Sequence, residues 1–596
     1  MSKAVKGLIA VVVLAIIAVA AFFAFGNKQD AKDTAKVGNL NVAYNNDKKA
    51  ISGGDLKVAE VSDTPFQGSY LSPLQDDMVT SNMFAPTGSG IFYNDKSFKI
   101  IDSKDAPANV KLDDKAKTAT ITLNKNLKWS DGKQVTAKDY EFTYELIAKP
   151  AYGSDRWSTS LANIEGLSAF HSGKADKISG ITYPDGADGK TVKIQFKKMT
   201  PGMTNSGNGY YLESVSPYHY LKDIKPKDLV SSKANTTKPL VWGAWAPKKI
   251  VAGQSILYTP NKYYYGDKPK FDTITYEIVS TSKIVAALKA HKYDFTTDNI
   301  ANLYPQIKKI SGYTTTGQTD LYISLKYFNL GHYDEAKGEN VMDRKSAVSD
   351  VKVRQAMAYA LNIEQVNKKF NNGLKTRAKT LVPPIFKDAY DSSLKGFPED
   401  TKKANKLLDE AGWKLNKKTG IREKDGKELA LTYLARSGNA TSEAVAQNNI
   451  QQWKKIGIKV SLYNGRLQDF NTWAELVQAN DNKWDITDAA WGLSSEPSQQ
   501  DLFSKEAPFN YGHFTSDALT KALDNIDSEK SLDPAYRKKA FATYQKLMQD
   551  QAYVIPDSTA ITYTPVNKRL VGYTSAYDAN NLWDTLGGSS NQLATK

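Results

Sequence analysis

The sequence contains no cysteine and only five histidines among its 596 residues. The missing cysteines exclude disulfides, thiolate metal sites, a cysteine nucleophile and lipid attachment through an N-terminal cysteine. The histidines are widely separated, and none of them belongs to an H-E-x-x-H motif. A zinc site built from them without cysteine is not expected. The sequence therefore predicts no metal and no other cofactor.

Catalytic motifs are also missing. No G-x-S-x-G nucleophile elbow and no EF-hand loop occur. The nearest match to a phosphate-binding loop is "YPDGADGKT", residues 183–191, where Pro184 replaces the first required glycine. A turn-rich hairpin is the better interpretation. Carboxylates are plentiful, but none of their pairs is singled out by its setting, so a glycosidase-type pair is neither supported nor excluded. Nothing indicates an enzyme, and an extracellular hydrolase is the least favoured alternative.

The charge is basic but distributed along the chain. Lys and Arg number 79 against 64 Asp and Glu, which gives a formal net charge of +15. A nucleic-acid binder usually concentrates such charge on one stripe, whereas here lysines are interleaved with acidic residues, as in residues 401–428. We predict a solvated, lysine-rich surface and no nucleic-acid partner. Attraction to a membrane or an anionic cell-wall polymer is the alternative.

One long hydrophobic run is present, from Leu8 to Phe25, after two lysines. As a helix it would span about 27 Å, close to the thickness of a bilayer core. The "AVA" at residues 18–20 could instead be the cleavage site of a secretory signal. Residues 1–26 are therefore predicted to be a signal peptide or a retained N-terminal membrane anchor. We favour the anchor because the apolar run continues beyond the possible cleavage site.

Residues 27–52 are polar, mixed in charge and without sustained periodicity, which is typical of a flexible tether. From residue 53 onward, short strand-like runs alternate with turns and amphipathic helices. This order predicts a mixed α/β fold that also contains antiparallel meanders. A chain of this length is expected to form two or three domains.

The stretch "LKWSDGKQVTAKD", residues 127–139, predicts a strand, a turn and a helix start. The preceding "ATITLNKNLKW" alternates apolar and polar residues, as a half-buried strand does. The Asp-Gly pair at residues 131–132 supplies the turn. Thr136 followed by Asp139 resembles a capping box. We therefore expect a strand that ends at Trp129 and a helix that begins after Thr136.

Three helices are expected in the second half of the chain. Residues 349–370 are predicted to form one core-packing helix. Residues 400–413 should form a helix that ends at Gly412, and residues 443–463 a helix that ends near Gly457 and is followed by a strand. The residues expected on the buried face of the first helix are Val353, Met357, Ala360 and Leu361.

The stretch "LKWSDGKQVTAKD" resembles the signature segment of extracellular solute-binding protein family 5, the oligopeptide- and dipeptide-binding proteins of ABC importers. In that family a strand ends in W-S-D-G-K-x-[VL]-T-A-x-D. One departure is His291, in the matching segment 285–295, which stands where the family usually has glycine. The resemblance runs from about residue 53 to the C-terminus. Further segments match in the family's order: 243–279, 285–295, 349–366, 403–413, 453–463 and 551–565.

The resemblance implies an α/β, two-lobe periplasmic-binding-protein-like fold, of type II and the large peptide-binding class, with an extra subdomain on lobe one. The ligand would lie between the lobes, which would close on it by hinge motion. The implied boundaries are 53–318 for lobe one with its inserted subdomain at about 96–215, 319–558 for lobe two, 559–596 for the return to lobe one, and crossovers near 315–320 and 555–562.

The resemblance also implies the function. The protein would be a monomer that captures oligopeptides and delivers them to the permease subunits of an ABC importer, whose ATPase subunits are separate chains. It would lie at the extracellular face of a Gram-positive cell membrane, anchored by its N-terminal helix, or be secreted if the signal is cleaved. Gram-positive relatives commonly carry a lipidated cysteine, and its absence here fits the anchor better. The alternatives are a peptide-pheromone receptor, or a binder of another small solute such as nickel or a sugar.

The same resemblance implies which residues contact a peptide. Arg436 could pair with a peptide carboxylate in a bidentate manner, and Trp491 would form a wall of the pocket. Several family members hold the ligand's ammonium group with an aspartate that this chain lacks, so Glu496 is expected to supply the negative charge. The complete set of candidates is Tyr322, Phe328, Asn329, Arg436, Asn439, Trp491, Ser494 and Glu496.

Overall fold

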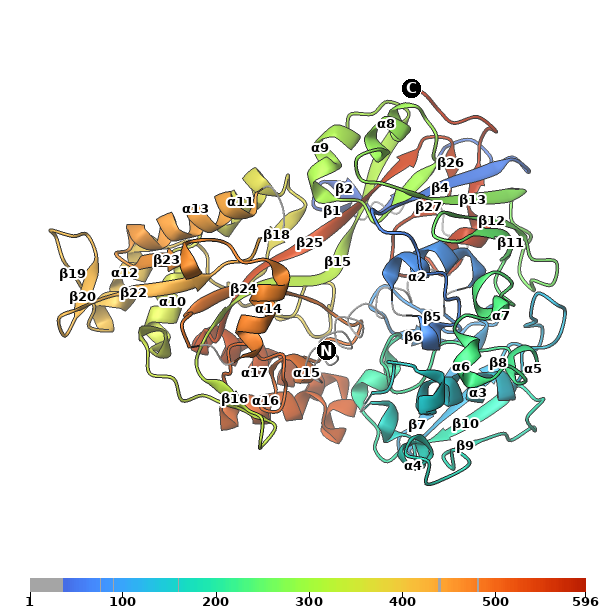
Figure 1. The fold of residues 1–596 in the computed structure, drawn as a ribbon, viewed down its shortest axis with the longest axis horizontal. Coiled ribbons are helices and arrows are strands. Elements are labelled where there is room, and N and C mark those ends of the chain that lie inside the picture. The colour runs from blue at the N-terminus through green and yellow to red at the C-terminus, as the bar shows by residue number, and fades with distance from the viewer. Residues whose placement is uncertain (1–35, 76, 89, 159, 438–440, 480–481) are drawn as a thin grey trace. The chain divides into compact units, whose positions relative to one another are not determined.

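The computed structural model describes residues 36–596 except 76, 89, 159, 438–440 and 480–481 (Figure 1). The chain divides into two compact units. Unit one comprises the chain up to Thr319 together with Ser494–Glu496 and Ile561–Lys596. Unit two comprises Asp320–Leu493 and Pro497–Ala560. The predicted anchor or signal, residues 1–26, and the first part of the predicted tether lie outside the described residues. The rest of the predicted tether, residues 36–52, is not a free tether in the structure, because Leu40 and Val42 are buried and β3 (Ala43–Tyr44) pairs with β27 (Tyr573–Thr574) of unit one.

Unit one is built on a mixed sheet in which β4 occupies a central place. The β4 strand lies parallel to both β13 and β14, and Val58 pairs with Tyr276 on one side and Phe295 on the other. Five of its seven residues are buried, as expected for a strand covered on both faces. In order, the strands are β11 (Trp245–Val251), β12 (Ser255–Pro260), β13 (Thr273–Val279), β4 (Asp55–Val61), β14 (Phe295–Thr297) and the last part of β25 (Val554–Asn567).

The core of unit one joins residues from both ends of the chain. Leu56 and Val58 of β4 pack in one cluster with Trp245, Leu570 and Trp583. Each large apolar side chain buried in this way contributes about 1.5–3 kcal/mol. The C-terminal elements that complete the unit are β26 (Leu570–Val571), β27 (Tyr573–Thr574), α18 (Leu582–Thr585) and β28 (Gly587–Gly588).

A second, smaller sheet lies within unit one. Its strands pair antiparallel in the order β7-β8-β10-β9. Leu146 and Phe142 of helix α3 (Ala137–Ala148) pack in a separate apolar cluster with Leu71 and Leu221. The strands are β7 (Ala108–Asp113), β8 (Thr118–Leu123), β10 (Thr191–Gln195) and β9 (Ile181–Thr182).

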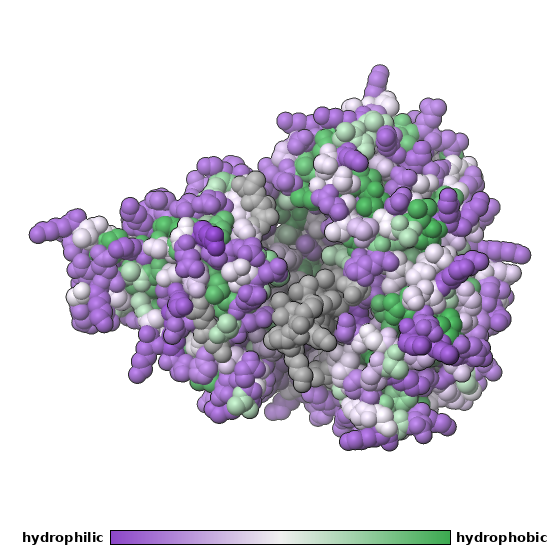
Figure 2. Space-filling model, viewed as in Figure 1, coloured by the Kyte–Doolittle hydropathy of each residue, from purple (hydrophilic) through white to green (hydrophobic). Residues whose placement is uncertain are grey.

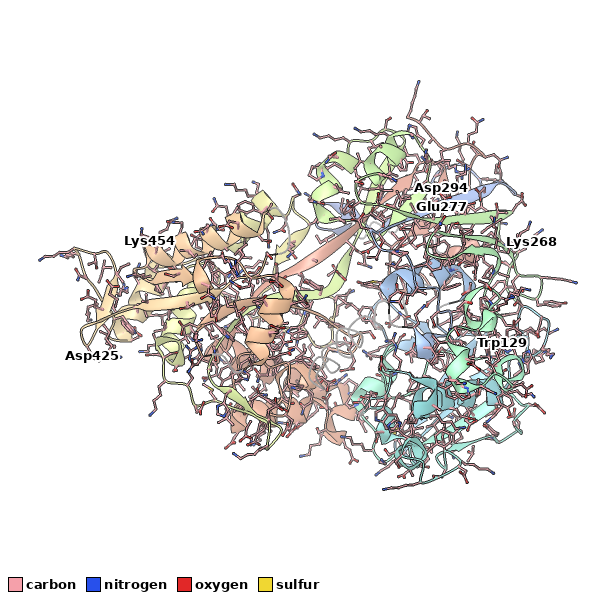
Figure 3. All side chains as sticks on the ribbon, viewed as in Figure 1. Trp129, Lys268, Glu277, Asp294, Asp425 and Lys454 are labelled. Atoms are coloured by element: carbon pink, nitrogen blue, oxygen red, sulfur yellow. The ribbon has the colours of Figure 1, made fainter. Side chains whose placement is uncertain are left out.

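The predicted capping box at the start of α3 is confirmed. Thr136 accepts a hydrogen bond from the backbone of Asp139, whose carboxylate accepts one from the backbone N–H of Thr136 at 2.9 Å. The carboxylate also accepts a hydrogen bond at 3.0 Å from Nε1 of the buried Trp129, the residue labelled in Figure 3. Gly132 has a φ of +90°, which glycine adopts without strain. The hydrogen bonds to Asp139 therefore connect Trp129, just before the turn, to the first turn of helix α3.

The predicted extension of the preceding strand to Trp129 is wrong. Strand β8 ends at Leu123. The side chain of Asn124 then accepts a hydrogen bond from the backbone N–H of Asn126, and Leu127 N–H donates to the Asn124 carbonyl at 3.0 Å. Such a local asparagine turn competes with strand pairing. The apolar alternation of the sequence continues through this turn without a strand.

Unit two is built on the strands β15, β24, β22 and β23, in that order. Strand β15 (Tyr313–Phe328) starts in unit one and β25 ends there, so these two strands connect the units. β15 runs antiparallel to β24 (Ile486–Gly492), whereas β22 (Ala430–Leu434) is parallel to both β24 and β23 (Lys459–Leu462). The short β18 (Lys375–Arg377) pairs with β25.

Eight helices described in unit two accompany this sheet (Figure 1). Helix α10 packs against α12, and α16 packs against α17. Their bounds are α10 (Val351–Tyr359), α11 (Ile363–Phe370), α12 (Thr401–Glu410), α13 (Ser442–Lys455), α14 (Phe470–Gln478), α15 (Gln500–Phe503), α16 (Asp517–Ile526) and α17 (Pro534–Gln551).

The single helix predicted for residues 349–370 is two helices. Asn362 lies between them and caps α11 by accepting a hydrogen bond from the backbone of Gln365 at 2.9 Å. The four predicted core residues of this stretch are nevertheless buried. The ends predicted at Gly412 and Gly457 are confirmed, because both glycines follow their helices with positive φ.

The remaining described elements are short. Figure 2 shows hydrophilic residues over most of the visible surface. Among the helices of the described residues, which begin at residue 36, none is long and apolar enough to cross a membrane. The minor elements are β1 (Lys36–Val37), β2 (Leu40–Asn41), β3 (Ala43–Tyr44), α2 (Met78–Phe84), β5 (Tyr93–Asn94), β6 (Ile100–Ile101), α4 (Leu167–His171), α5 (Tyr218–Leu221), α6 (Pro226–Leu229), α7 (Lys233–Thr236), α8 (Ile284–Lys289), α9 (Tyr304–Ile307), β16 (His332–Asp334), β17 (Glu339–Val341), β19 (Lys414–Leu415), β20 (Arg422–Lys424) and β21 (Lys427–Glu428).

Candidate functional site

The carboxyl ends of the parallel strands of unit two define one edge of its sheet. Arg436 follows the end of β22 by two residues, and Trp491 is the penultimate residue of β24. In open α/β sheets, ligands bind outside the carboxyl ends of the strands, where the connecting loops converge. We call the surroundings of Arg436 and Trp491 the carboxyl edge of unit two.

Arg436 lies over aromatic rings at this edge. Its guanidinium carbon is 5.0 Å from the ring centre of Trp473 and 5.5 Å from that of Phe470. Both rings belong to α14, and Phe470 is 47% exposed whereas Trp473 is buried. A guanidinium held over aromatic faces keeps its hydrogen-bond donors free for an anion or a peptide carbonyl. Arg436 is itself partly exposed.

Trp491 is fixed by contacts on more than one side. Its Nε1 donates a hydrogen bond to the hydroxyl of Tyr327 at 2.9 Å. Its ring centre lies 5.4 Å from that of Tyr511 and 5.6 Å from that of Phe509. Only 9% of Trp491 is exposed. The Trp491 ring is therefore held rigidly at the carboxyl edge of unit two, and its role as a pocket wall stays a prediction.

Tyr322 lies in the same neighbourhood. It pairs with Gly492 across β15 and β24, one register position from Trp491. Burial raises the pKa of Tyr322, and the positive charge of Arg436 partly opposes this shift. Burial likewise raises the pKa of Tyr511 to about 12, again opposed in part by Arg436. The structure thus brings Tyr322, Arg436 and Trp491 together.

Chemically, this edge offers flat apolar faces, hydroxyl groups and one cation. Tyr and Trp rings bind apolar groups while their tips form hydrogen bonds. Arginine pairs with carboxylates in a planar, bidentate geometry. Such a combination suits a ligand with alternating polar and apolar groups.

Phe328 and Asn329 lie elsewhere. Phe328 pairs with Ile486, six residues along β15 from Tyr322, which corresponds to about 20 Å of extended strand. Phe328 is completely buried and Asn329 is 2% exposed. The Asn329 side chain donates to the carbonyl of Trp484 at 3.2 Å. The expected role as ligand contacts is thus not supported at the observed positions, because both residues are part of the interior of unit two.

The predicted residue Asn439 falls within 438–440, outside the described residues. Ser494 and Glu496 form a local turn: Ser494 Oγ donates to the Glu496 carbonyl at 2.7 Å and accepts from the Glu496 backbone at 3.2 Å. This segment belongs to unit one, where the side chain of Asn205 donates to the Ser495 carbonyl at 3.0 Å.

An ion cluster that the sequence analysis missed lies in the unit-two sheet. Lys326, with a side chain only 5% exposed, contacts Asp488 at 2.5 Å and Asp557 at 3.2 Å. Tyr433 donates a hydrogen bond to Asp488. Burial disfavours the charged lysine, but the two aspartates and Tyr433 outweigh it and hold the pKa of Lys326 well above its usual value. Lys326 therefore stays charged.

One sequence signal could have revealed this cluster. Lys326 interrupts the apolar run "LYISLKYFNL", and Asp488 interrupts "ITDAAW". A single charge inside a strand that is otherwise apolar needs a partner. The two residues are direct cross-strand partners in the β15–β24 register. The strand register, however, could not be derived from the sequence.

In unit one, a buried carboxyl group marks the carboxyl end of β4. Glu60 is completely buried, and its Oε1 accepts a hydrogen bond from Asn82 at 3.0 Å. The hydroxyl groups of Tyr276 and Thr297 point to Oε2. Burial raises the pKa of Glu60 to about 8, with the hydrogen bonds from Thr297 and Asn82 opposing the shift. Glu60 is therefore mostly protonated at neutral pH.

Two α/β units connected by β15 and β25, with ligand-type side chains at a carboxyl edge, define a two-lobe solute-binding protein. The chain belongs to the bacterial extracellular solute-binding proteins of family 5: the family model "Bacterial extracellular solute-binding proteins, family 5 Middle" matches residues 105–511. The predicted family and fold class are confirmed. The chain is a substrate-binding protein and not an enzyme.

Relatives with assigned roles are similar over nearly the whole chain. The oligopeptide-binding protein OppA of Lactococcus lactis subsp. lactis (strain IL1403) is 57% identical over 589 residues, which is 98% of each chain. The oligopeptide-binding protein AppA of Bacillus subtilis (strain 168) is 28% identical, over 85% of this chain and 86% of the relative.

Solved structures have the same fold. Lactococcal OppA, complexed with an endogenous peptide in the closed conformation, is 58% identical, with a TM-score of 0.73 over 90% of this chain and all of the other. The unliganded open form of the murein tripeptide-binding protein MppA has a TM-score of 0.70 over 92% of this chain and 98% of the other, at 20% identity. This second likeness concerns the fold alone.

Proposed function

We propose that the protein captures oligopeptides outside the cell and delivers them to the permease of an ABC importer. The observation that carries this proposal is the 57% identity to a protein named as oligopeptide-binding OppA, over 98% of both chains. The 58% identical lactococcal OppA structure holds an endogenous peptide. The carboxyl edge of unit two adds chemistry that suits a peptide, with aromatic faces and an arginine.

The two compact units are assigned to the two lobes of the family. Unit one corresponds to the proposed lobe one, including the return of the chain after residue 560, and unit two corresponds to the proposed lobe two. The β7–β10 sheet with α3 corresponds to the proposed inserted subdomain at about 96–215. Peptide contacts in lobe two come from Tyr322, Arg436 and Trp491, with Asn439 as a further candidate.

Glu496 is proposed to supply negative charge to the ligand's ammonium group, with Ser494 bracing its turn. We expect Glu496→Gln to weaken the binding of peptides with a free N-terminus by about tenfold, which equals about 1.4 kcal/mol. N-acetylated peptides should bind the variant and the wild type equally, as calorimetry can measure. The matched control is Glu506→Gln, which removes an exposed carboxylate from the same stretch. Equal losses for free and acetylated peptides would contradict this role.

The partners and the location complete the proposal. The permease and the ATPase subunits are separate chains, and the Leu8–Phe25 segment anchors the monomer at the outer face of a Gram-positive membrane. The mass of the mature protein distinguishes a retained anchor from a cleaved signal.

Deleting the gene and following the uptake of labelled oligopeptides tests the transport role. Uptake should be lost in the deletion strain and restored by the wild-type gene. Normal uptake combined with a lost response to a peptide signal would favour the pheromone-receptor alternative instead.

A further inference from the structure

A small cavity in unit one lies outside the strand-end site described above. It measures about 30 Å³, enough for one or two water-sized groups. Its walls come from the segment before β11, the turn after β12 and helix α18. The side chains that give it chemical character are Trp242, Tyr264, Tyr265, Trp583 and Asp584.

The cavity combines aromatic rings with one carboxylate. Trp242 and Trp583 are 7% and 6% exposed, so their rings are fixed in the wall. Tyr264 and Tyr265 pack on each other with ring centres 5.2 Å apart. Aromatic rings arranged around a space attract cations through the negative charge on their faces, and this is how ammonium groups are recognised in aromatic cages.

Asp584 is the charged group of this cavity. Among the described residues its side chain receives one hydrogen bond, from the Tyr264 hydroxyl to Oδ2. None of the described residues that line the cavity is a lysine, an arginine or a histidine. Asp584 is partly buried. A carboxylate withdrawn from water normally has a cationic partner or several hydrogen bonds. Burial raises the pKa of Asp584 to about 7, which is the direction expected when such a partner is missing.

The electrostatic surroundings have the same sign. Asp584 and Asp267 both raise the pKa of Tyr264, after the larger effect of burial. Asp584 and Asp105 act in the same way on Tyr265, against a hydrogen bond to Tyr93 that lowers it. Asp105 is paired with Lys104 at 3.1 Å, so the negative charge at the rings comes mainly from Asp584 and Asp267. This charge favours a cation over a neutral or anionic guest.

The size of the cavity limits the ligand. Space for about two water-sized groups suits ammonium or methylammonium, and tetramethylammonium, with four methyl groups around one nitrogen, is larger than either. We propose that this cavity binds a small ammonium-type cation, held by the Asp584 carboxylate and the surrounding rings of Trp242, Tyr264 and Tyr265. The ligand is either free ammonium or a small primary amine.

The test measures binding to the intact protein by calorimetry and thermal unfolding. Ammonium chloride and methylammonium chloride should bind and raise the unfolding temperature above that in sodium chloride of equal concentration. Tetramethylammonium chloride should have no effect beyond that of sodium. Binding of ammonium but not methylammonium would assign free ammonium as the ligand. If all four salts behave alike, the proposal is overturned.

Two variants sharpen this test. Asp584→Asn should weaken methylammonium binding at least tenfold, whereas Asp114→Asn, an exposed residue of unit one outside the cavity wall, should change it less than twofold. Unchanged binding in Asp584→Asn would overturn the proposal. Oligopeptide binding should persist in that variant, which separates this site from the proposed peptide site.

A second measurement needs no variant and guards against a failure of Asp584→Asn to fold. Saturation of aromatic protein protons in the wild type should transfer to the methyl group of methylammonium in an NMR difference experiment, because the rings line the site. Excess ammonium should suppress the transfer. Absence of transfer at concentrations where calorimetry detects binding would contradict the proposed position of the ligand.

Discussion

At the scale of single residues, Glu60 shows how burial controls protonation. Its side chain is completely buried, yet the groups around it are hydroxyls and an amide rather than a cation. Hydrogen bonds of this kind satisfy a protonated carboxyl group without fully stabilising the charged form. Glu60 therefore links the stability of unit one to pH.

We expect Glu60→Gln to flatten the pH dependence of stability. The pKa of Glu60 is about 8 in the folded protein, against 4.5 for a solvent-exposed glutamate as in the unfolded chain. Between these values the native state keeps a proton that the unfolded chain has released. The stabilising contribution is thus complete below about pH 4.5 and is lost as the pH rises through 8. The expected slope is up to about 1.4 kcal/mol per pH unit.

Urea unfolding of the wild type and of Glu60→Gln between pH 5 and 8 measures this difference. The control is Glu277→Gln in the neighbouring strand β13 (Figure 3), which replaces a partly exposed carboxylate and should keep the wild-type slope. A Glu60→Gln protein with the same slope as the wild type would show that Glu60 ionises normally in the folded state.

Single residues also show where sequence reasoning succeeds. The capping box of Thr136 and Asp139 depends only on hydrogen bonds between residues three positions apart. The sequence therefore predicted it correctly. The position of Phe328 and Asn329 could not be predicted, because it depends on how β15 pairs with β24. Sequence alternation tells which residues share a face of a strand, but not how far along the strand a site lies.

At the scale of elements, local polar groups decided where regular structure ends. Asn124 ended β8 before Trp129, and Asn362 divided one apolar helical stripe into α10 and α11. In both cases the apolar pattern continues across the break, so periodicity alone predicted a longer element. The four residues expected on the buried face of the first helix are nevertheless buried, because burial follows the apolar pattern and not the exact ends of the helix.

The carboxyl edge of unit two gives an element-scale prediction. Arg436 is held by rings of α14 in front of the strand ends, so Arg436→Ala removes a cation from the proposed peptide site without opening the core. We expect about tenfold weaker peptide binding by calorimetry, equal to about 1.4 kcal/mol, and little change in stability. Arg466→Ala, at an exposed arginine of the same unit, is the control and should bind normally. Wild-type affinity of Arg436→Ala would remove Arg436 from the site.

At the scale of the whole molecule, buried charges connect distant parts of the chain. Arg569 Nε and Nη2 each lie 2.6 Å from a carboxylate oxygen of Asp294 (Figure 3), and Nη2 also donates to the Asp55 carbonyl at 2.7 Å. Arg569 and Asp294 are 2% and 0% exposed. The returning C-terminal segment is thereby joined to β4 and to the start of β14.

We expect Arg569→Ala to destabilise unit one by about 3–5 kcal/mol, because it leaves the buried Asp294 charge without its partner. Chemical unfolding measures the loss. Lys546→Ala breaks an exposed helical pair with Asp550 and should cost about 0.5 kcal/mol or less. Equal effects of the two substitutions would contradict the importance of the buried pair.

The central claim is that the protein carries intact oligopeptides. Native mass spectrometry of protein purified from its own source tests this most directly, with the bound material released and sequenced. The expected result is a set of protein–peptide complexes whose peptides are recovered uncleaved and exchange with added oligopeptides. A protein that retains no peptide and neither binds nor exchanges added oligopeptides, or one that returns them cleaved, would contradict the account.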